Sequence, residues 1–254
     1  MREYVDLETA RSASGVRLVT VGGVPSPWSE SAKGLLRLAG VPFVAVRLMP
    51  GDKDVRAWTG ARNAPVLMLD GEPARTGWAE ILEVVERIAP ASARSLVPSA
   101  ARDRVRMFGL AHELLGEGGL AWCARLLAVH AGLESEGARG FPTMIATYLA
   151  KKYGYAKDRV EAAKARVAEG WSVLAEALGE REYFFFDDRP SALDVYAACT
   201  VNIFALPPED RCAMAPPIRF AFESMRGAIA EPPPSIVALR DRMYARHLPL
   251  PIEV

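Results

Sequence analysis

A serine at the start of a predicted helix is the first group in this sequence that could perform chemistry. Ser26 stands directly before Pro27 and Trp28, where an apolar helical pattern begins. A helix N-terminus carries partial positive charge, so a hydroxyl placed there can donate a hydrogen bond to a bound anion. The same arrangement is typical of a structural cap, with serine as the N-cap residue and proline as the first helical residue. Ser29 and Ser31 are fallback hydroxyls in the same helix.

Cysteine, histidine and glycine patterns exclude several other chemistries. The chain has three cysteines at spacings that fit no zinc motif: Cys123, Cys199 and Cys212. None lies in the first 122 residues, which excludes a CxxC redox site there and argues against a disulfide framework. No HExxH, GxxxxGK[ST], GxGxxG or GxSxG pattern occurs, which removes the zinc-protease, P-loop, Rossmann and α/β-hydrolase interpretations. We therefore predict no metal site.

The composition is that of an ordinary globular protein with balanced charge. Lysine and arginine total 31, and aspartate and glutamate total 31, so the formal net charge is zero. A generic nucleic-acid binder needs a basic excess, and an anionic membrane attracts basic segments, so we predict neither partner. The first residues carry charges in place of an apolar signal segment, and no run of about 18 apolar residues occurs. The simplest prediction is a cytoplasmic protein.

Residues 16–89 alternate short apolar runs with helical patterns. Four strands are predicted, the last two joined by an Asp70–Gly71 turn: 16–21, 43–48, 65–69 and 72–75. Three helices alternate with them: 28–39, 52–59 and 78–88. The order β-α-β-α-β-β-α begins with a parallel crossover and ends with a hairpin, which is typical of a thioredoxin-like domain.

A linker rich in proline, alanine and serine separates this part from a second part with a different pattern. Helix formers with apolar stripes follow it, in helices predicted at 101–132, 143–152, 156–178, 191–205 and 236–247. The predicted fold is therefore an α/β N-terminal domain followed by an all-α C-terminal domain. The predicted divisions are an N-terminal extension at 1–15, the thioredoxin-like domain at 16–90, the linker at 91–100 and the all-helical domain at 101–254.

Three short stretches, in this order, carry a resemblance to a known family. Ser26–Pro27–Trp28–Ser29 leads into a helix that is followed by Gly40–Val41–Pro42–Phe43. Ala64–Pro65–Val66–Leu67 comes next, and Pro190–Ser191–Ala192–Leu193–Asp194 lies beyond the linker. The chain thereby resembles the cytosolic glutathione S-transferase superfamily. The resemblance implies glutathione as co-substrate, a small hydrophobic electrophile as second substrate, and a homodimer.

The resemblance also assigns roles to residues of the N-terminal part. In this family a serine, tyrosine or cysteine at the start of the first helix faces the glutathione sulfur, and the matching residue here is Ser26. A hydrogen bond donated to the thiolate favours the charged form, and each pKa unit gained is about 1.4 kcal/mol. The family proline matches Pro65, whose bond to Ala64 is expected to be cis. The backbone of Ala64 is then expected to pair with the cysteinyl backbone of glutathione.

The chain departs from the family at the third expected contact with glutathione. The family has an acidic residue or glutamine and then serine at the start of the helix after the hairpin, where they hold the γ-glutamyl carboxylate. The matching residues here are Gly77 and Trp78, which offer no such hydroxyl. Gly77 leaves backbone N–H donors open, Thr76 is a displaced hydroxyl, and Trp78 either stacks on a ligand or packs against the C-terminal domain. Losing one charge-assisted hydrogen bond costs about 1.5–3 kcal/mol.

The family binds its second substrate between the domains, against the first long helix of the C-terminal domain. Trp28 and the predicted helix at 101–132 supply the candidates. Phe108, His112 and Leu115 share one face of that helix, at i, i+4 and i+7. Such a stripe is also typical of a packed core. The full set on this helix is Arg104, Phe108, His112, Leu115 and Trp122.

Ser191 and Asp194 form the pattern of a capping box at the start of a buried helix. Ser191 is expected to accept from the Asp194 amide, while the Asp194 carboxylate reaches back to the Ser191 amide. A buried helix start needs these donors satisfied, so we predict a structural role and no chemistry.

Together these features favour an enzyme of the glutathione S-transferase type, in which Ser26 activates the thiolate for attack on a hydrophobic electrophile. Two alternatives are open because of Gly77 and Trp78. In the first, the chain is a non-catalytic ligand-binding or protein-interaction protein of the same fold that does not bind glutathione. In the second, it is an enzyme that uses another thiol or no thiol. A shared fold does not decide among them, because one fold hosts many functions.

Overall fold

A mixed three-stranded sheet lies at the centre of the N-terminal part. The computed structural model describes residues 4–254. Strand β1 (Val16–Val21) is the middle strand of the order β2-β1-β3. It pairs in parallel with β2 (Phe43–Leu48) and antiparallel with β3 (Val66–Met68). The parallel pair follows from the predicted β-α-β crossover, and the β-branched residues of β1 suit a strand buried on both faces.

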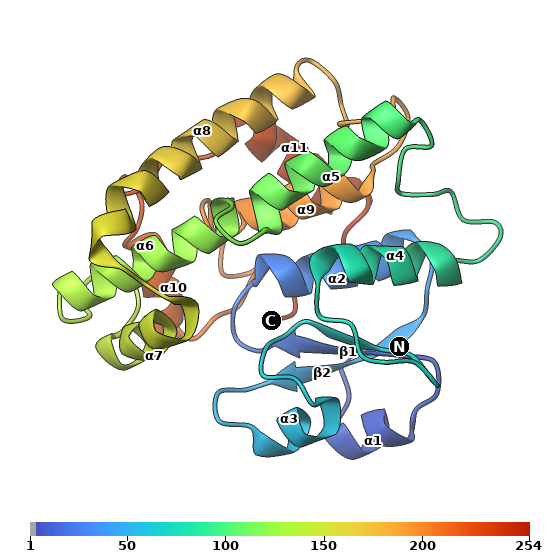
Figure 1. Ribbon diagram of the computed structural model, residues 1–254, viewed down its shortest axis with the longest axis horizontal. Coiled ribbons are helices and arrows are strands. Elements are labelled where there is room, and N and C mark those ends of the chain that lie inside the picture. The colour runs from blue at the N-terminus through green and yellow to red at the C-terminus, as the bar shows by residue number, and fades with distance from the viewer. Residues whose placement is uncertain (1–3) are drawn as a thin grey trace.

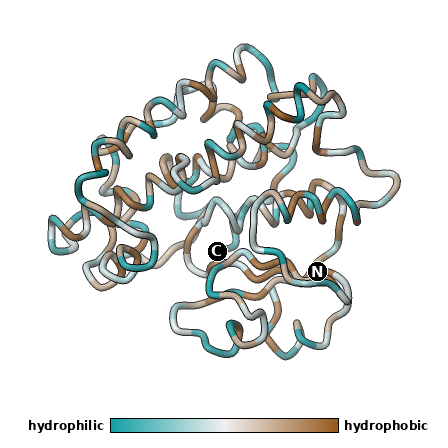
Figure 2. The backbone as a smooth tube through the Cα atoms, in the orientation of Figure 1, coloured by the Kyte–Doolittle hydropathy of each residue, from teal (hydrophilic) through white to brown (hydrophobic). Residues whose placement is uncertain are grey.

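Two helices cover each face of this sheet (Figure 1). Helices α2 (Pro27–Leu38) and α4 (Trp78–Ile88) pack on the face toward the helical part. Helices α1 (Leu7–Ser12) and α3 (Lys53–Thr59) lie on the opposite face. Figure 2 shows that hydrophobic residues are concentrated in the strands between these two layers. The N-terminal part is therefore a thioredoxin-like domain, as the sequence predicts.

Part of the predicted N-terminal extension belongs to this sheet unit. Tyr4 forms an isolated parallel bridge with Ala45 of β2. Helix α1 follows, and its N-cap Asp6 accepts a hydrogen bond of 2.7 Å from the Thr9 amide. Residues 1–3 of the extension lie outside the described residues.

The predicted fourth strand at 72–75 is wrong. Within the described chain only Arg75 of this segment pairs, in an antiparallel bridge with Leu67. Pro73 has no N–H to give to a ladder, and the Glu72 amide is used in the turn, where it donates a hydrogen bond of 3.1 Å. The single bridge still holds the following residues beside β3.

Helices make up the rest of the chain, with α9 at their centre. In order they are α5 (Ala101–Leu115), α6 (Leu120–Glu134), α7 (Thr143–Tyr153), η1 (Lys157–Arg159), α8 (Val160–Leu178), α9 (Ala192–Val201), α10 (Pro216–Glu223) and α11 (Pro234–Arg246). Every residue of α9 is buried, and α2, α5 and α11 pack around it. This helix therefore joins the helical domain to the sheet domain.

The single helix predicted over 101–132 is wrong, because the structure divides it into α5 and α6. Gly118 in the break has a φ of 78°, and a Cβ atom at Gly119 would lie 2.6 Å from the Glu113 carbonyl oxygen. Only glycine fits both requirements at low cost. Apolar periodicity continues on both sides of the break, so it does not reveal the interruption. The two helices follow one another along one line in Figure 1.

The predicted capping box at the start of α9 forms in the structure. The Asp194 carboxylate accepts from the Ser191 amide at 2.7 Å, from the Ser191 hydroxyl at 2.6 Å and from the Phe184 amide at 3.0 Å. Burial raises the pKa of Asp194 to about 6, against the opposing effect of these hydrogen bonds. At neutral pH the box therefore holds a buried carboxylate among three donors.

The C-terminal tail returns to the sheet domain and encloses a lysine. Residues 248–254 follow α11, and Lys33 of α2, which is 1% exposed, lies against this tail. The Lys33 ammonium pairs with the Glu30 carboxylate at 2.8 Å. It also donates to the Tyr4 hydroxyl at 3.0 Å and to the Glu253 carbonyl at 2.7 Å. Helix α2, the first described residues and the tail therefore meet at one buried charge.

Gly34 sets how closely α2 approaches α9. A Cβ atom there would lie 2.7 Å from Val195 Cγ1 and 3.2 Å from Leu248 Cδ2. We expect Gly34→Ala to lower the free energy of unfolding by about 1–3 kcal/mol, because overpacking outweighs the better helix propensity of alanine. Urea unfolding followed by circular dichroism measures this. Gly109→Ala, with nothing within 4 Å of the new atom, is the control and should stabilise slightly; equal effects would contradict the packing argument.

Candidate functional site

Ser26 and Ala64 are brought to the same edge of the sheet by the pairing of β1 with β3. Val19 lies opposite Val66 in this antiparallel pair. Val21 ends β1 two residues after Val19, and Ala64 stands two residues before Val66, so both leave the ladder at the same end. The chain passes from Val21 through a short loop to Ser26 and α2. The predicted catalytic hydroxyl and the predicted backbone contact therefore belong to neighbouring segments.

The single bridge found in place of the predicted fourth strand brings the start of α4 close to Ala64 and Pro65. Leu67 lies opposite Arg75 in this antiparallel bridge. Pro65 stands two residues before Leu67, and Gly77, the N-cap of α4, stands two residues after Arg75, so both leave the bridge at the same end. Two helix N-termini, those of α2 and α4, thus begin at one edge of the sheet (Figure 1). Their partial positive charges favour an anionic ligand at that edge.

Ser26 is the N-cap of α2, and its carbonyl accepts from the Glu30 amide at 2.8 Å. Its side chain makes no capping hydrogen bond, so the hydroxyl interaction of the structural-cap alternative is not formed. Ser26 is 9% exposed, whereas Ser29 is 0% and Ser31 is 1% exposed. The Ser29 hydroxyl is also used in the fold, where it accepts from the Val21 amide at 3.0 Å. Ser26 is therefore the most accessible of the three candidate hydroxyls.

The Ala64–Pro65 peptide bond is cis, as predicted. Ala64 is half-buried, and its N–H and C=O form no hydrogen bond with any residue in the range 4–254. An extended ligand backbone beside Ala64 would meet one free donor and one free acceptor, as an added strand does.

The start of α4 offers backbone donors without a side-chain hydroxyl. The Gly77 N–H donates to the Glu80 carboxylate at 3.1 Å. The amides of the first helical turn have no acceptor within the helix, so they are open to a ligand. Thr76 is exposed just before them. Glu80 is also exposed, and its carboxylate occupies a donor that a ligand carboxylate would need.

Trp78 turns toward the helical domain. Its ring centroid lies 5.7 Å from that of Tyr196 in an edge-to-face contact and 6.1 Å from that of Phe108. The Tyr196 hydroxyl donates to the Trp78 carbonyl at 3.3 Å. These contacts agree with the packing alternative for Trp78, and they tie α4 to α5 and α9.

Trp28, in the first turn of α2, lies against the helical domain near the break between α5 and α6. Its Nε1 donates to the Leu115 carbonyl at 2.8 Å. The guanidinium carbon of Arg125 lies 4.8 Å from the ring centroid of Trp28, 4.5 Å from that of Trp122 and 3.7 Å from that of Tyr153. Burial lowers the pKa of Arg125 to about 10, so it stays charged at neutral pH. The sequence prediction missed Arg125, although a lone arginine in the apolar first half of α6 was the available signal.

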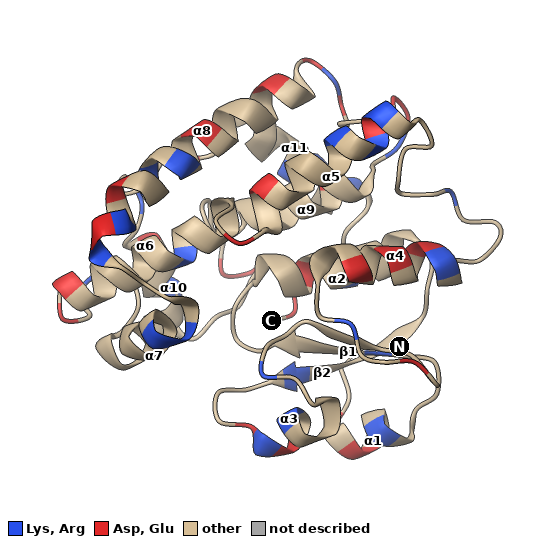
Figure 3. Ribbon diagram, in the orientation of Figure 1, with Lys and Arg blue, Asp and Glu red and all other residues tan. Residues whose placement is uncertain are grey.

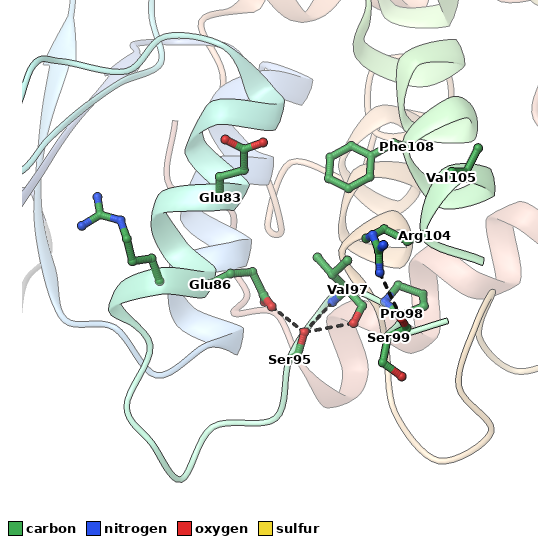
Figure 4. A pocket seen from close by; sticks show the side chains of 10 residues that line it. Glu83, Glu86, Ser95, Val97, Pro98, Ser99, Arg104, Val105 and Phe108 are labelled. Atoms are coloured by element: carbon green, nitrogen blue, oxygen red, sulfur yellow. Dashed lines mark hydrogen bonds between the residues drawn. The ribbon is translucent and has the colours of Figure 1, made fainter. Parts of the chain in front are cut away.

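Within residues 4–254, Phe108 has its ring contact with Trp78 and neither it nor His112 forms a ring contact or hydrogen bond with Trp28. Phe108 lines an open groove of about 920 Å³ between the second half of α4, the linker and the start of α5 (Figure 4). Arg104 lines the same groove, and Glu86 fixes the linker beside it by accepting from the Leu96 amide at 2.8 Å. His112 is exposed on α5. Of the residues predicted to bind the second substrate, Arg104 and Phe108 therefore line this groove, whereas Trp28 and Trp122 lie around Arg125.

The cysteine thiols of this chain are not candidate nucleophiles. All three cysteines are free and buried, and burial raises the pKa of each, that of Cys199 to about 12. They are protonated at neutral pH and are poor nucleophiles. No cluster of metal-ligating side chains occurs among residues 4–254, and no helix in that range is both long and apolar enough to cross a bilayer. Charges of both signs are interspersed on the face shown in Figure 3.

The helical domain matches a known family. Residues 157–242, from η1 into α11, match the family model described as the C-terminal domain of glutathione S-transferase. The matched range contains the capping box of α9. No curated protein matches the chain.

Solved structures share the fold over nearly the whole chain. A glutathione S-transferase from Methylobacterium radiotolerans, in complex with glutathione sulfonate, is 18% identical with a TM-score of 0.58, covering 91% of each chain. A glutathione S-transferase domain-containing protein from Marinobacter aquaeolei is 20% identical with a TM-score of 0.61, covering 91% of this chain and 98% of its own. A beta-etherase from Sphingobium is 18% identical with a TM-score of 0.59, covering 90% and 99%. The predicted resemblance to the glutathione S-transferase superfamily, and its two-domain fold, are confirmed.

Proposed function

We propose that this protein, which has the glutathione S-transferase fold, binds reduced glutathione and joins its sulfur to a small hydrophobic electrophile. One observation carries the proposal. The Ser26 hydroxyl, which caps no amide, and the unpaired backbone of Ala64 lie on neighbouring segments at one sheet edge. The complex of the Methylobacterium radiotolerans protein with glutathione sulfonate supports glutathione as the ligand of this fold.

In the proposed reaction Ser26 donates a hydrogen bond to the glutathione sulfur. A free thiol has a pKa of about 8.5, so little of it is nucleophilic at neutral pH. The hydroxyl and the N-terminus of α2 favour the thiolate, and the thiol proton passes to water. The thiolate then attacks an electrophilic carbon. A C–S bond forms, and a leaving group departs with its electron pair.

The γ-glutamyl carboxylate would be held by the first-turn amides of α4. The missing serine hydroxyl at Trp78 removes one hydrogen bond, which weakens binding about 10- to 150-fold. Glu80 adds a second obstacle, because its carboxylate accepts from the Gly77 amide. We therefore expect a weaker affinity for glutathione than a site with both groups would give.

Replacing Ser26 by alanine is the direct test of the proposed role. We expect Ser26→Ala to lower kcat/KM for glutathione and an activated aryl chloride by about 10-fold or more, as expected for the loss of one donor to a developing charge. The pKa of the bound thiol, read from the pH dependence of kcat/KM for the aryl chloride at saturating glutathione, should rise by about one unit for a tenfold effect. Ser26→Thr, which keeps a hydroxyl, should retain part of the rate.

The control is Ser172→Ala, which removes an exposed hydroxyl on α8. It should leave kcat/KM and the pKa of the bound thiol unchanged. If Ser26→Ala kept the wild-type kcat/KM and the thiol pKa did not shift, the proposed role of Ser26 would be contradicted. Calorimetry with reduced glutathione up to millimolar concentration tests the ligand itself. No heat and no competition there would overturn the glutathione proposal.

A second candidate function is favoured by the hydrogen bond between Glu80 and the Gly77 amide. This contact fills the position of a ligand carboxylate, which suits a thiol that lacks the γ-glutamyl group. Competition calorimetry with small thiols separates the two candidates. Binding of such a thiol, with none of glutathione, would favour the second.

Two further properties belong to this proposal. We place the protein in the cytoplasm, where thiols are kept reduced, because its three cysteines are unpaired. We also propose a homodimer, which is the assembly that the family resemblance implies.

A further inference from the structure

Arg125 is a half-buried cation whose Nε and Nη2 atoms have no hydrogen-bond acceptor among residues 4–254. It is the one charged side chain in the apolar first half of α6. Its Nε and Nη2 atoms are buried, and neither has a hydrogen-bond partner. It takes part in none of the ion pairs formed among residues 4–254. A guanidinium donates through all three nitrogens and accepts nothing, so the buried N–H groups of Nε and Nη2 require an acceptor from elsewhere.

Three aromatic rings enclose the guanidinium without meeting that requirement. Trp28, Trp122 and Tyr153 lie within 4.8 Å of its central carbon, measured to each ring centroid. Cation–π attraction stabilises the charge from the ring faces. The N–H bonds point outward in the plane of the guanidinium, where an oxygen acceptor binds best. Two buried N–H-bearing atoms left without acceptors disfavour the folded protein unless a ligand supplies them.

The position of this cage connects it to the proposed reaction. Trp28 lies two residues after Ser26, in the first turn of α2, and its hydrogen bond to Leu115 fixes the indole against the helical domain. The guanidinium therefore lies against a residue of the helical turn that begins at Ser26. A second substrate lying along Trp28 would place one end near Ser26 and the other near Arg125.

We propose that Arg125 binds a carboxylate on the electrophilic substrate, so that the preferred substrates are small aromatic carboxylic acids that carry a leaving group. The carboxylate accepts from the guanidinium, and the apolar part of the substrate packs on the rings of the cage. The proposal rests on the proposed function for its reactive end. The carboxylate site is a separate binding site that can be measured without glutathione.

The kinetic test compares one electrophile with and without its charge. Chloronitrobenzoate and its methyl ester carry the same leaving group, and the ratio of variant to wild type removes their difference in intrinsic reactivity. We expect Arg125→Met to raise KM for the acid by about 10- to 100-fold, which is the loss of a charge-assisted pair, with kcat little changed. KM for the ester should change by less than about threefold. Arg125→Lys keeps the charge without the planar guanidinium, so its KM for the acid should lie between those of the wild type and Arg125→Met.

The binding test uses unreactive nitrobenzoate in calorimetry without glutathione. The wild-type protein should bind it, Arg125→Met should not, and Arg102→Met, which removes an exposed arginine on α5, should bind normally. Failure of the wild type to bind nitrobenzoate, or equal KM changes for acid and ester, would overturn the inference. Nitrobenzoate binding without glutathione binding would leave this inference standing and overturn the proposed function. Arg125→Lys keeps the test valid if Arg125→Met does not fold.

Discussion

Asp194→Ala is expected to lower the free energy of unfolding by about 3–5 kcal/mol, since three buried donors lose their common acceptor. Asp194 is 0% exposed. It accepts from the amide and hydroxyl of Ser191 and from the amide of Phe184. The donors cannot turn to water, because α9 is buried over its whole length. The substitution therefore costs more than the loss of an ordinary helix cap.

Urea denaturation near pH 7.5, where Asp194 is ionised, measures the effect. Asp52→Ala is the matched control, because Asp52 also accepts from two amides at a helix start, at 3.1 Å and 3.0 Å, but is only half-buried. Its loss is expected to cost about 1 kcal/mol, as for an ordinary N-cap. Equal costs at the two positions would show that burial of the box is not what makes Asp194 important.

Lys33→Met is the second large effect, with an expected loss of about 3–4 kcal/mol, in the range for breaking a buried ion pair. The substitution keeps the length of the side chain and removes its charge. It deletes the pairing with Glu30 and the hydrogen bonds to Tyr4 and Glu253. Thermal and urea unfolding measure the loss. The double variant Glu30→Gln, Lys33→Met should be less damaging than the sum of the two single changes.

The pH dependence of the same variant tests the electrostatic part of the argument. Burial acts to lower the pKa of Lys33, but the Glu30 carboxylate and Tyr4 more than offset it, so the pKa lies above the usual 10.5. A raised pKa contributes stability that is fully present below the unfolded value and is lost as pH rises through the folded value. The difference between wild type and Lys33→Met should therefore be constant from pH 7 to about 10 and shrink above that.

Lys53→Met, at an exposed position in α3, should change stability by less than about 0.5 kcal/mol and show no such dependence. A difference between wild type and Lys33→Met that stayed constant to pH 12 would contradict the charge argument. A loss for Lys33→Met as small as that of the control would contradict the importance of the buried contacts.

The features predicted correctly are those that short stretches of sequence determine. Strands β1 and β2 follow from runs of β-branched residues, and the capping box follows from the S-x-x-D spacing at Ser191. The fourth strand failed because Pro73 removes an N–H from the ladder, a cost that apolar patterning ignores. The break between α5 and α6 was missed because periodicity continues across it.

The features missed depend on residues far apart in the sequence. A lysine in an amphipathic helix is predicted to be exposed. Lys33 is buried because Tyr4 and Glu253, which are distant in sequence, accept hydrogen bonds from it. The sequence alone predicts Arg125 as a surface charge, and only the structure shows Trp28 and Tyr153 packed against it. The prediction that Ser26 acts on a ligand rested on the family motif, and the absence of a capping hydrogen bond was visible only in the structure.

The closure of the tail over Lys33 has a consequence for how the protein is made. The Tyr4 hydroxyl donates to the Glu253 carbonyl across a separation of 249 residues. On the ribosome the sheet domain emerges first, while Glu253, which encloses its lysine, follows Lys33 by 220 residues. Closing so long a loop is entropically costly, so this contact belongs to the final stage of assembly. Until then the nascent sheet domain must keep Lys33 hydrated, and α2 cannot settle completely onto the strands.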